Sequence, residues 1–225
     1  MSAPDPARQP GGRPPGQRPS GEHLSGEHRA GERQASEQQG GERVIVLALG
    51  SNLGDPLASL QRGLDLLCAS LPCTAVSGVY RTAPVGGPPQ DDYLNAVLLA
   101  RSALPARQIL ACGQAAEAAL HRVRDQRWGP RTLDVDIIAC GDERRDDPDL
   151  TLPHPRAHLR AFVLVPWLEV APDAVLPGYG AVAALLAGAV GTAGVRRLDD
   201  AALRLPALAR PSAAAGLPPD PGAAS

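Results

Sequence analysis

Lysine is absent from this chain of 225 residues, and all 22 of its basic residues are arginine. No residue is therefore available for a Walker A lysine, a Schiff-base lysine or the strand lysine of protein kinases. Any phosphate must be bound by arginine, backbone amides or metal ions, and arginine binds phosphate oxygens bidentately without losing its charge. The formal net charge of −2 gives no global basic field, so we expect no nucleic-acid partner.

Cysteines and long apolar runs are also scarce. None of the four cysteines forms a CxxC pair, and Cys68, Cys73, Cys112 and Cys140 all stand in apolar neighbourhoods. This pattern predicts buried free thiols in a reduced compartment rather than disulfides or zinc ligands. The polar N-terminus lacks the apolar segment of a signal peptide, and no apolar run approaches the roughly 20 residues of a membrane span. We therefore expect a cytoplasmic protein without a membrane partner.

Composition divides the chain into three parts. Residues 1–42 are rich in Gly, Pro, Glu, Arg, Gln and Ser and contain almost no apolar residues. Such a segment buries too little surface to offset its ordering entropy, which predicts a disordered low-complexity tail. We expect one folded domain over residues 43–205 and a flexible Ala/Pro-rich tail over residues 206–225.

The pattern of apolar residues predicts the elements of the domain. It indicates strands at about 44–49, 74–81, 93–101 and 133–141, with helices at 56–70 and 105–120. Asp55 is a good helix N-cap, and Pro56 suits the first helical position. The order βαββαβ is typical of the α+β, ferredoxin-like sandwich, with two helices on one face of a four-stranded, mainly antiparallel sheet. C-terminal additions follow: a short extended piece at 150–155 and a mostly helical segment at 156–170, interrupted by Pro166.

The stretch RWGPRTLDVDII, residues 127–138, carries most of the chemistry. Its alternation predicts a half-buried strand with Leu133, Val135 and Ile137 toward a core and Asp134 and Asp136 on the opposite side. Same-face neighbours lie roughly 7 Å apart, close enough to share one or two hard cations. A bare acidic strand would more often be a solvated face, but Trp128 beside a Gly-Pro turn is costly to expose without a ligand. Nearby arginines add sites for anionic oxygens.

Five stretches in order resemble the family of 6-hydroxymethyl-7,8-dihydropterin pyrophosphokinases. They are ALGSNLGDP (48–56), VYRTAPVGG (79–87), DYLNAV (92–97), RWGPRTLDVDII (127–138) and LPHPRAHLRAFVLVP (152–166). The resemblance covers most of residues 43–200. It implies a ferredoxin-like enzyme of folate biosynthesis that transfers pyrophosphate from ATP to the pterin hydroxymethyl group and releases AMP. The substrates would be ATP and the pterin, and we expect a monomer.

The resemblance also implies roles for individual residues. Asp134 and Asp136 would bind two Mg²⁺ ions, and Arg122 and Arg131 would stabilise the transferred phosphates. The residues implied in ATP binding are Glu117, Arg124, Arg127, Trp128, Ile137, His154 and Arg160. Those implied in pterin binding are Thr82, Ala83, Val85, Tyr93, Asn95, Trp128 and Phe162, with Tyr93 and Phe162 as the stacking pair. His121 departs from the pattern, since many relatives have glycine there.

Several alternatives stay open at this point. Another two-metal nucleotide-dependent transferase or nuclease would use the same aspartates without a pterin pocket. An RNA-binding ferredoxin-like module would need exposed sheet aromatics and a basic surface, and the sequence has neither. Ser51 and Asn52 are most simply interpreted as residues that cap a helix and shape a loop. His154 and His158 are four apart, but no third zinc ligand has matching spacing.

Overall fold

The computed structural model describes residues 41–84, 88–120, 130–189 and 192–207. The two predicted tails therefore lie almost entirely outside the described residues, and their disorder stays a prediction. Within the described ranges, no helix is long and apolar enough to cross a membrane.

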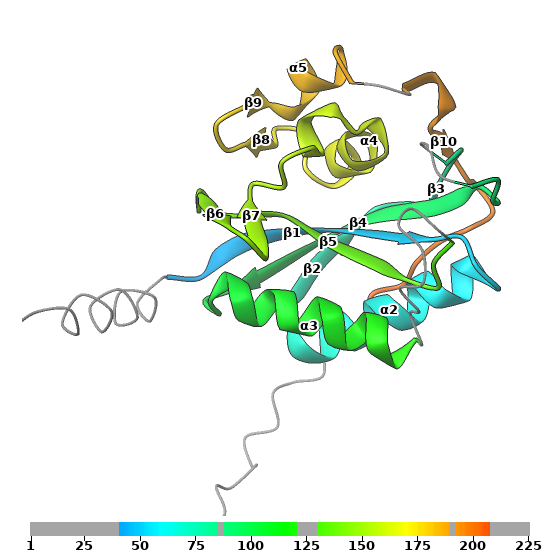
Figure 1. Ribbon diagram of the computed structural model, residues 1–225, viewed down its shortest axis with the longest axis horizontal. Helices are drawn as coiled ribbons and strands as arrows, with labels where there is room; N and C mark the ends of the chain where they lie inside the picture. Colours follow the sequence, from blue (N-terminus) through cyan, green and yellow to red (C-terminus); the bar gives the residue numbers. More distant parts are fainter. Residues whose placement is uncertain (1–40, 85–87, 121–129, 190–191, 208–225) are drawn as a thin grey trace, which may run out of the picture. The chain divides into compact units, whose positions relative to one another are not determined.

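A six-stranded antiparallel sheet organises the domain (Figure 1). Its strands run in the order β10-β3-β4-β1-β5, with β2 also paired to β4. Every pairing is antiparallel, which confirms the prediction of an α+β fold with a mainly antiparallel sheet. The bounds are β1 (Arg43–Ser51), β2 (Cys73–Val76), β3 (Tyr80–Thr82), β4 (Tyr93–Ser102), β5 (Asp134–Cys140) and β10 (Arg196–Arg197).

The sheet has two strands more than the predicted four. The segment predicted as one strand at 74–81 is divided into β2 and β3, because the Ser77 side chain takes part in the ladder. The Ser77 Oγ accepts a hydrogen bond from the Val97 N–H at 2.9 Å, while the Ser77 N–H donates to the Val97 carbonyl, also at 2.9 Å. The second addition, β10, comes from a two-residue segment too short for a periodic pattern.

Two helices cover one face of the sheet, α2 (Pro56–Ser70) and α3 (Ala106–Ala119) (Figure 1). Asp55 caps α2 as predicted, since its carboxylate accepts a hydrogen bond from the Ala58 N–H at 3.0 Å. Leu60, Leu64 and Leu67 recur at helical spacing and are fully buried against the sheet. With the inward side chains of β1, β4 and β5 they form the first core cluster.

Most of the C-terminal additions cover the opposite face (Figure 1), whereas Leu150 and Leu152 of the hairpin at residues 145–152 lie in the first core cluster. The additions comprise two small hairpins, β6 (Arg145–Asp147) with β7 (Leu150–Leu152) and β8 (Val175–Leu176) with β9 (Gly180–Ala181), the 3₁₀ turns η2 (Ala157–Leu159) and η3 (Thr192–Gly194), and the helices α4 (Ala161–Val170) and α5 (Val182–Leu186). Val163, Leu164 and Trp167 of α4 pack on Val46 and Val97 in the second core cluster. The domain therefore buries both faces of its sheet.

The prediction that Pro166 interrupts the helix at 156–170 was wrong. The break is at Arg160, whose backbone is extended, and α4 continues through Pro166. Burial of Val163, Leu164 and Trp167 on both sides of the proline outweighs the one helical hydrogen bond that proline cannot make.

The cysteine prediction was wrong for one pair. Cys68 near the end of α2 and Cys73 at the start of β2 form a disulfide, with their Cα atoms 5.4 Å apart. The turn between helix and strand brings positions five residues apart within bridging distance, which a search for CxxC spacing overlooks. Cys112 and Cys140 are free thiols, as predicted; Cys140 is fully buried, whereas Cys112 is only partly buried.

These assignments predict how the cysteines react. In the native protein we expect a thiol reagent to modify Cys112 alone, because Cys140 is inaccessible and burial raises its pKa to about 11. Denaturation without reductant should release the two free thiols, and reduction should raise the count to all four. Colorimetric titration checks this, with Cys112→Ser as the control that abolishes native reactivity. Four reactive thiols in the unreduced, denatured chain would contradict the disulfide.

Candidate active site

Three neighbouring strands bring the predicted polar residues together on the face that α4 covers. Gly50 on β1 pairs with Asn95 of β4 on one side and with Asp134 of β5 on the other. Two residues earlier on β1, Ala48 pairs with Asp136. Because side chains alternate along a strand, Asn95, Asp134 and Asp136 share one face. Their alternates on β5, Leu133, Val135 and Ile137, lie in the first core cluster as predicted.

Each of the two aspartates is paired with an arginine. Asp134 forms an ion pair with Arg131 from the preceding loop, and Asp136 accepts a hydrogen bond from the Arg160 Nη1 at 3.1 Å. All four side chains are partly exposed. The formal charges of this cluster sum to zero, so it can admit a polyphosphate together with its cations without leaving a buried charge unpaired.

His154 completes the cluster through a bulge in β5. The register between β1 and β5 shifts at Val46 and Leu47, and the carbonyl of Ile138 on the irregular stretch accepts a hydrogen bond from the His154 N–H at 2.9 Å. The His154 Nε2 lies 3.7 Å from the Asp136 carboxylate. Burial lowers the pKa of His154, although Asp136 opposes this shift. Its Nδ1 accepts a hydrogen bond from the Arg156 N–H at 3.1 Å, and its Nε2 also lies 3.4 Å from the Arg160 Nη1.

Glu117 supports the acidic strand from beneath. Its side chain is 5% exposed, and its Oε1 accepts a hydrogen bond from the Val135 N–H at 2.9 Å. Val135 lies between the two aspartates, so this bond fixes the strand that carries them. The contact of Glu117 with ATP stays a prediction; the structure gives it a positioning role.

An amide and a hydroxyl lie beside Asp134. The Asn95 Nδ2 donates a hydrogen bond to the Thr82 Oγ1 at 2.8 Å, and both residues are buried. Thr82 is directly opposite Tyr93 on β4, and a Cβ built on Gly50 would lie 3.3 Å from the Asn95 Oδ1 and 3.9 Å from the Tyr93 Cδ1. Gly50 thus leaves open the space between the amide and the aromatic ring.

Phe162 lies at the other end of the cluster. The Arg160 guanidinium carbon is 5.4 Å from the centre of its ring, which joins Phe162 to Asp136 through Arg160. Tyr93 lies on the Asn95 and Asp134 side. The predicted stacking pair therefore flanks the charged cluster from two different elements, β4 and α4.

Asn52 was underestimated by the sequence interpretation. It is 4% exposed, and its Oδ1 accepts from the Arg131 N–H at 2.8 Å. Its Nδ2 donates to the Gln90 Oε1 at 2.9 Å and to the Asp91 carbonyl at 3.1 Å, and Gln90 also accepts from the Tyr93 hydroxyl. Asn52 caps no helix; it joins the loop after β1 to the arginine before β5 and to the segment before β4. Ser51, whose Oγ donates to the Thr132 carbonyl at 2.7 Å, also shapes a loop, so the loop-shaping part of the prediction is confirmed for both residues.

Not every predicted site residue is brought to this face. Ile137 is buried in the first core cluster, so it can reach a nucleotide only through its main chain. Ala83 is described and exposed. Val85, Arg122, Arg124, Arg127 and Trp128 lie outside the described residues, as does His121. His158 stacks on Tyr179, with ring centroids 4.2 Å apart, which gives it a packing role.

Comparison with known proteins places this geometry in a family. The model of the 7,8-dihydro-6-hydroxymethylpterin-pyrophosphokinase family matches residues 46–172, more than half of the chain and all of the elements just described around the aspartates. The chain belongs to this family. The predicted resemblance is confirmed, and with it the prediction of a pyrophosphokinase of folate biosynthesis.

Curated relatives that match this chain over most of their own length share the pyrophosphokinase name. A 2-amino-4-hydroxy-6-hydroxymethyldihydropteridine pyrophosphokinase of Mycobacterium tuberculosis (strain ATCC 25618 / H37Rv) is 48% identical over 142 residues, 59% of this chain and 74% of that protein. The protein of the same name from Pseudomonas aeruginosa is 41% identical over 160 residues, 70% of this chain and 98% of its own length. The match therefore spans nearly the whole length of the Pseudomonas relative.

Solved structures agree with the fold. The crystal structure of a Plasmodium falciparum HPPK-DHPS triple mutant with pteroate superposes with a TM-score of 0.52 at 12% identity. The match covers 70% of this chain and 47% of that one. At this identity the likeness concerns the fold alone.

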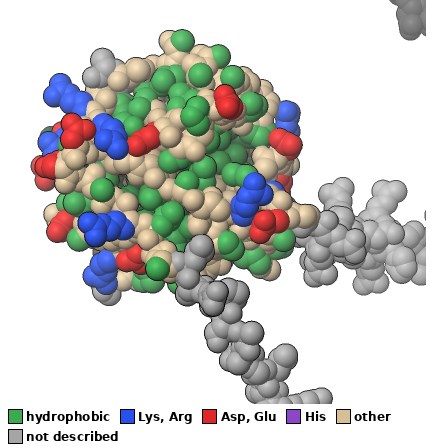
Figure 2. All heavy atoms as spheres, turned by 180° about the vertical axis from the view of Figure 1, so that it is seen from behind, with side chains coloured by type: hydrophobic (Ala, Val, Ile, Leu, Met, Phe, Trp, Pro, Cys, Tyr) green, Lys and Arg blue, Asp and Glu red, His purple; other side chains and the backbone are tan. Residues whose placement is uncertain are grey.

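Family membership removes the RNA-binding alternative, and the surface is in agreement. On the face seen in Figure 2, arginine and acidic side chains are interspersed around a largely apolar centre. Among the described residues of that face, Figure 2 shows no extended basic patch of the kind that binds a phosphate backbone.

Proposed function

We propose that this pyrophosphokinase transfers the β,γ-pyrophosphoryl group of ATP to the hydroxymethyl oxygen of 6-hydroxymethyl-7,8-dihydropterin, with two Mg²⁺ ions, on a ferredoxin-like domain. The products are the pterin diphosphate and AMP. The observation that carries this proposal is the neutral cluster of Asp134, Asp136, Arg131 and Arg160 beside the paired side chains of Asn95 and Thr82. The charged cluster suits a polyphosphate with its cations, and the Asn95–Thr82 pair suits the polar edge of a heterocycle.

Asp134 and Asp136 are better suited to Mg²⁺ than to a metal ion whose ligands all come from the protein. Among the described residues, no group of three or more His, Cys, Asp or Glu side chains is arranged to hold a metal ion. Mg²⁺ prefers oxygen ligands and is usually bound by one or two carboxylates together with water and substrate phosphates. Asp134 and Asp136 would hold the ions, which would supply charge neutralisation at the transferred phosphates.

The chain's own groups then exchange partners as ATP binds. Arg131 and Arg160 pair with the aspartates in the structure. With cations on the carboxylates, both guanidinium groups would be available to phosphate oxygens at the same place. Their forks bind such oxygens bidentately. The His154 Nε2 faces the same space, beside Asp136 and Arg160. Preorganised donors of this kind stabilise charge that develops on the transferred group.

Asn95 provides specificity for the second substrate. Its amide presents a donor and an acceptor, and the Thr82 contact orients the amide so that the Oδ1 lies toward Gly50. Tyr93 and Phe162 supply flat apolar area for a pterin between them. A heterocycle held there places its hydroxymethyl group toward the aspartates, and such positioning converts the transfer into an effectively intramolecular step. We further propose that Val85, Arg122, Arg124, Arg127 and Trp128 complete the two substrate sites, and that the enzyme is a monomer.

The deciding experiment is a measurement of AMP release from MgATP with and without 6-hydroxymethyl-7,8-dihydropterin. We expect AMP to form only with the pterin and in equal amount to the pterin diphosphate, and chelation of Mg²⁺ to abolish it. Nucleotide hydrolysis that ignores the pterin, or ADP as the product, would contradict the proposal and favour another two-metal transferase.

Gly50→Ala should weaken the pterin site selectively. The new methyl group would lie 3.3 Å from the Asn95 Oδ1. The Asn95 side chain cannot move away freely, because its amide is hydrogen-bonded to Thr82. We expect the KM for the pterin to rise about tenfold and the KM for ATP to change little, since the loss is of the order of one hydrogen bond. Gly41→Ala is the matched control, because nothing lies within 4 Å of a Cβ there. A parallel rise in both KM values would show that the methyl group disturbs the whole sheet instead.

A further inference from the structure

A segment near the C-terminus supports the edge of the sheet beside the proposed pterin site. In β10, Arg197 pairs with Tyr80 and Arg196 with Arg81 of β3. The Leu198 N–H adds a hydrogen bond to the Val79 carbonyl at 2.9 Å. We call residues 196–206 the C-terminal strap. It lies outside residues 46–172, the part that the family model matches.

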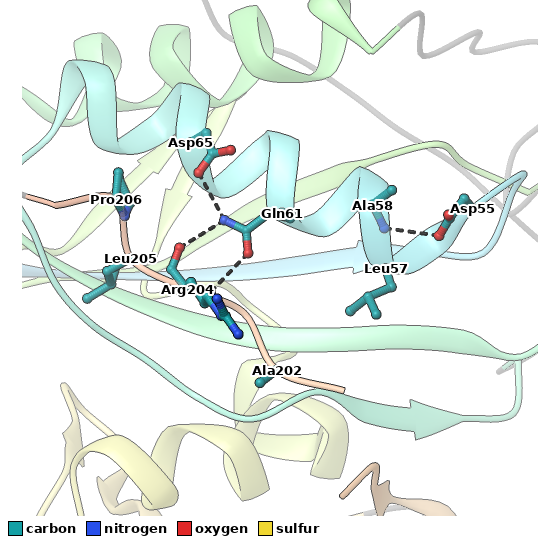
Figure 3. A pocket seen from close by; sticks show the side chains of 9 residues that line it. All are labelled: Asp55, Leu57, Ala58, Gln61, Asp65, Ala202, Arg204, Leu205 and Pro206. Carbon is teal, nitrogen blue, oxygen red and sulfur yellow. Dashed lines mark hydrogen bonds between the residues drawn. The ribbon is translucent and has the colours of Figure 1, made fainter. Parts of the chain in front are cut away.

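From the sheet edge at β3, the strap continues to helix α2. Leu203 is buried in the first core cluster. Arg204 then exchanges two hydrogen bonds with Gln61 of α2: the Gln61 Nε2 donates to the Arg204 carbonyl at 2.8 Å, and the Arg204 N–H donates to the Gln61 Oε1 at 2.9 Å (Figure 3). The strap is therefore anchored at both ends and joins the two layers around β3.

Glu169 of α4 connects the strap to β3. Its Oε2 accepts hydrogen bonds from the Gly78 N–H and from the Tyr80 hydroxyl, both at 2.9 Å. Its Oε1 accepts from the Arg197 Nη2 at 3.1 Å. Burial and the neighbouring carboxylate raise the pKa of Tyr80 to about 12, so its hydroxyl stays a donor. A Cβ on Gly78 would lie 2.8 Å from the Arg197 Nε, which shows how closely the guanidinium covers this turn.

The strand that these contacts hold is short and carries a site residue. β3 has three residues and pairs with β4 on one side and with the two residues of β10 on the other. Tyr80 is directly opposite Asn95, and Thr82 at the end of β3 accepts the Asn95 hydrogen bond. These short pairings give β3 few ladder hydrogen bonds of its own, so the side-chain contacts at this edge contribute to its position. The orientation of the Asn95 amide therefore depends on what anchors β3.

We propose that Glu169 and Arg197 are positioning residues for the pterin site, which act by fixing β3 and hence the Thr82–Asn95 pair. This inference rests on the proposed function, because it names the second substrate as the one affected. Neither residue contacts the charged cluster of Asp134 and Asp136, so ATP binding is independent of them.

Polar substitutions test the proposal in the full-length enzyme. Glu169→Gln replaces one carboxylate oxygen with an amide donor, so the side chain can no longer accept from Arg197 and from Gly78 and Tyr80 together. Arg197→Gln removes the guanidinium; the matched control is Arg196→Gln, the exposed neighbour on β10. We expect each test variant to raise the pterin KM, and the dissociation constant of a pterin analogue measured with a non-hydrolysable ATP analogue, about fivefold. The KM for ATP and kcat should stay within about twofold of the wild type. The double variant should be little worse than either single variant, because both break the same contact.

A purely structural role would give a different result. It would lower the melting temperature without separating the two KM values, or raise both together, and either result would overturn the proposal, as would Arg196→Gln behaving like Arg197→Gln. Failure of the proposed function is distinguishable, since the wild type itself would then release no AMP in response to the pterin.

Discussion

Asp136→Asn is expected to reduce pterin-dependent AMP formation by about 10²–10³. Asp136 accepts the Arg160 hydrogen bond and faces the His154 Nε2, so it is the point where the proposed cation site, an arginine and an imidazole meet. The substitution keeps the shape of the side chain and removes its charge. Initial rates of AMP release at saturating substrates measure the loss.

Nucleotide binding separates the proposed metal role from a general loss of structure. With Mg²⁺ present, Asp136→Asn should bind a non-hydrolysable ATP analogue more weakly than the wild type. Without Mg²⁺ it should bind the free nucleotide at least as well, because a carboxylate beside a polyphosphate repels it. Asp147→Asn is the matched control: Asp147 is also paired with arginines, Arg145 at 2.9 Å and Arg107 at 3.0 Å, but on β6. Equal effects of Mg²⁺ on the wild type and on Asp136→Asn would show that this carboxylate binds no cation.

Asn52→Ala is expected to lower kcat/KM by about 10² and the free energy of unfolding by about 1–3 kcal/mol. The buried amide makes three hydrogen bonds, to the Arg131 N–H, the Gln90 Oε1 and the Asp91 carbonyl. Alanine leaves these groups without their partner and releases Arg131, whose guanidinium holds Asp134. Chemical denaturation and steady-state kinetics measure the two effects.

Asn52→Asp is expected to separate the effect of Asn52 on ATP from its effect on the pterin. Aspartate keeps an acceptor for the Arg131 N–H but has no donor for the Gln90 Oε1 or the Asp91 carbonyl. We expect the KM for the pterin to rise more than the KM for ATP, since Gln90 also holds the Tyr93 hydroxyl. If both Asn52 variants raised the KM for ATP and the KM for the pterin equally, the acceptor and donor groups of the Asn52 amide would not act separately on the two substrates.

Local pattern was sufficient to predict the elements that matter most for the site. The alternation of Leu133 to Ile137 placed Asp134 and Asp136 opposite the core, and the structure agrees because a half-buried strand permits no other arrangement of that pattern. The cap at Asp55 was equally predictable, since it depends on an interaction between residues three apart. The motifs also predicted the family, because they combine specific residue types in a fixed order.

Local sequence patterns could not predict the contacts between distant segments. Arg160 pairs with Asp136 across 24 residues, and Asn52 reaches Arg131 across 79. The disulfide between Cys68 and Cys73 was missed because a turn, rather than sequence spacing, sets the distance between the two thiols. Each of these contacts depends on how the layers pack after the loops close.

The sequence by itself determined the family, the mainly antiparallel α+β fold and the face of β5 that carries the acidic residues, because hydrophobic period, caps and motifs are local properties of the chain. Only the tertiary structure decided which partner each of these residues has. It placed Arg160 and His154 on Asp136, Glu117 beneath Val135 and the strap against β3. The physical reason is that such partners come from separate elements, whose relative positions are set by burying both faces of the sheet.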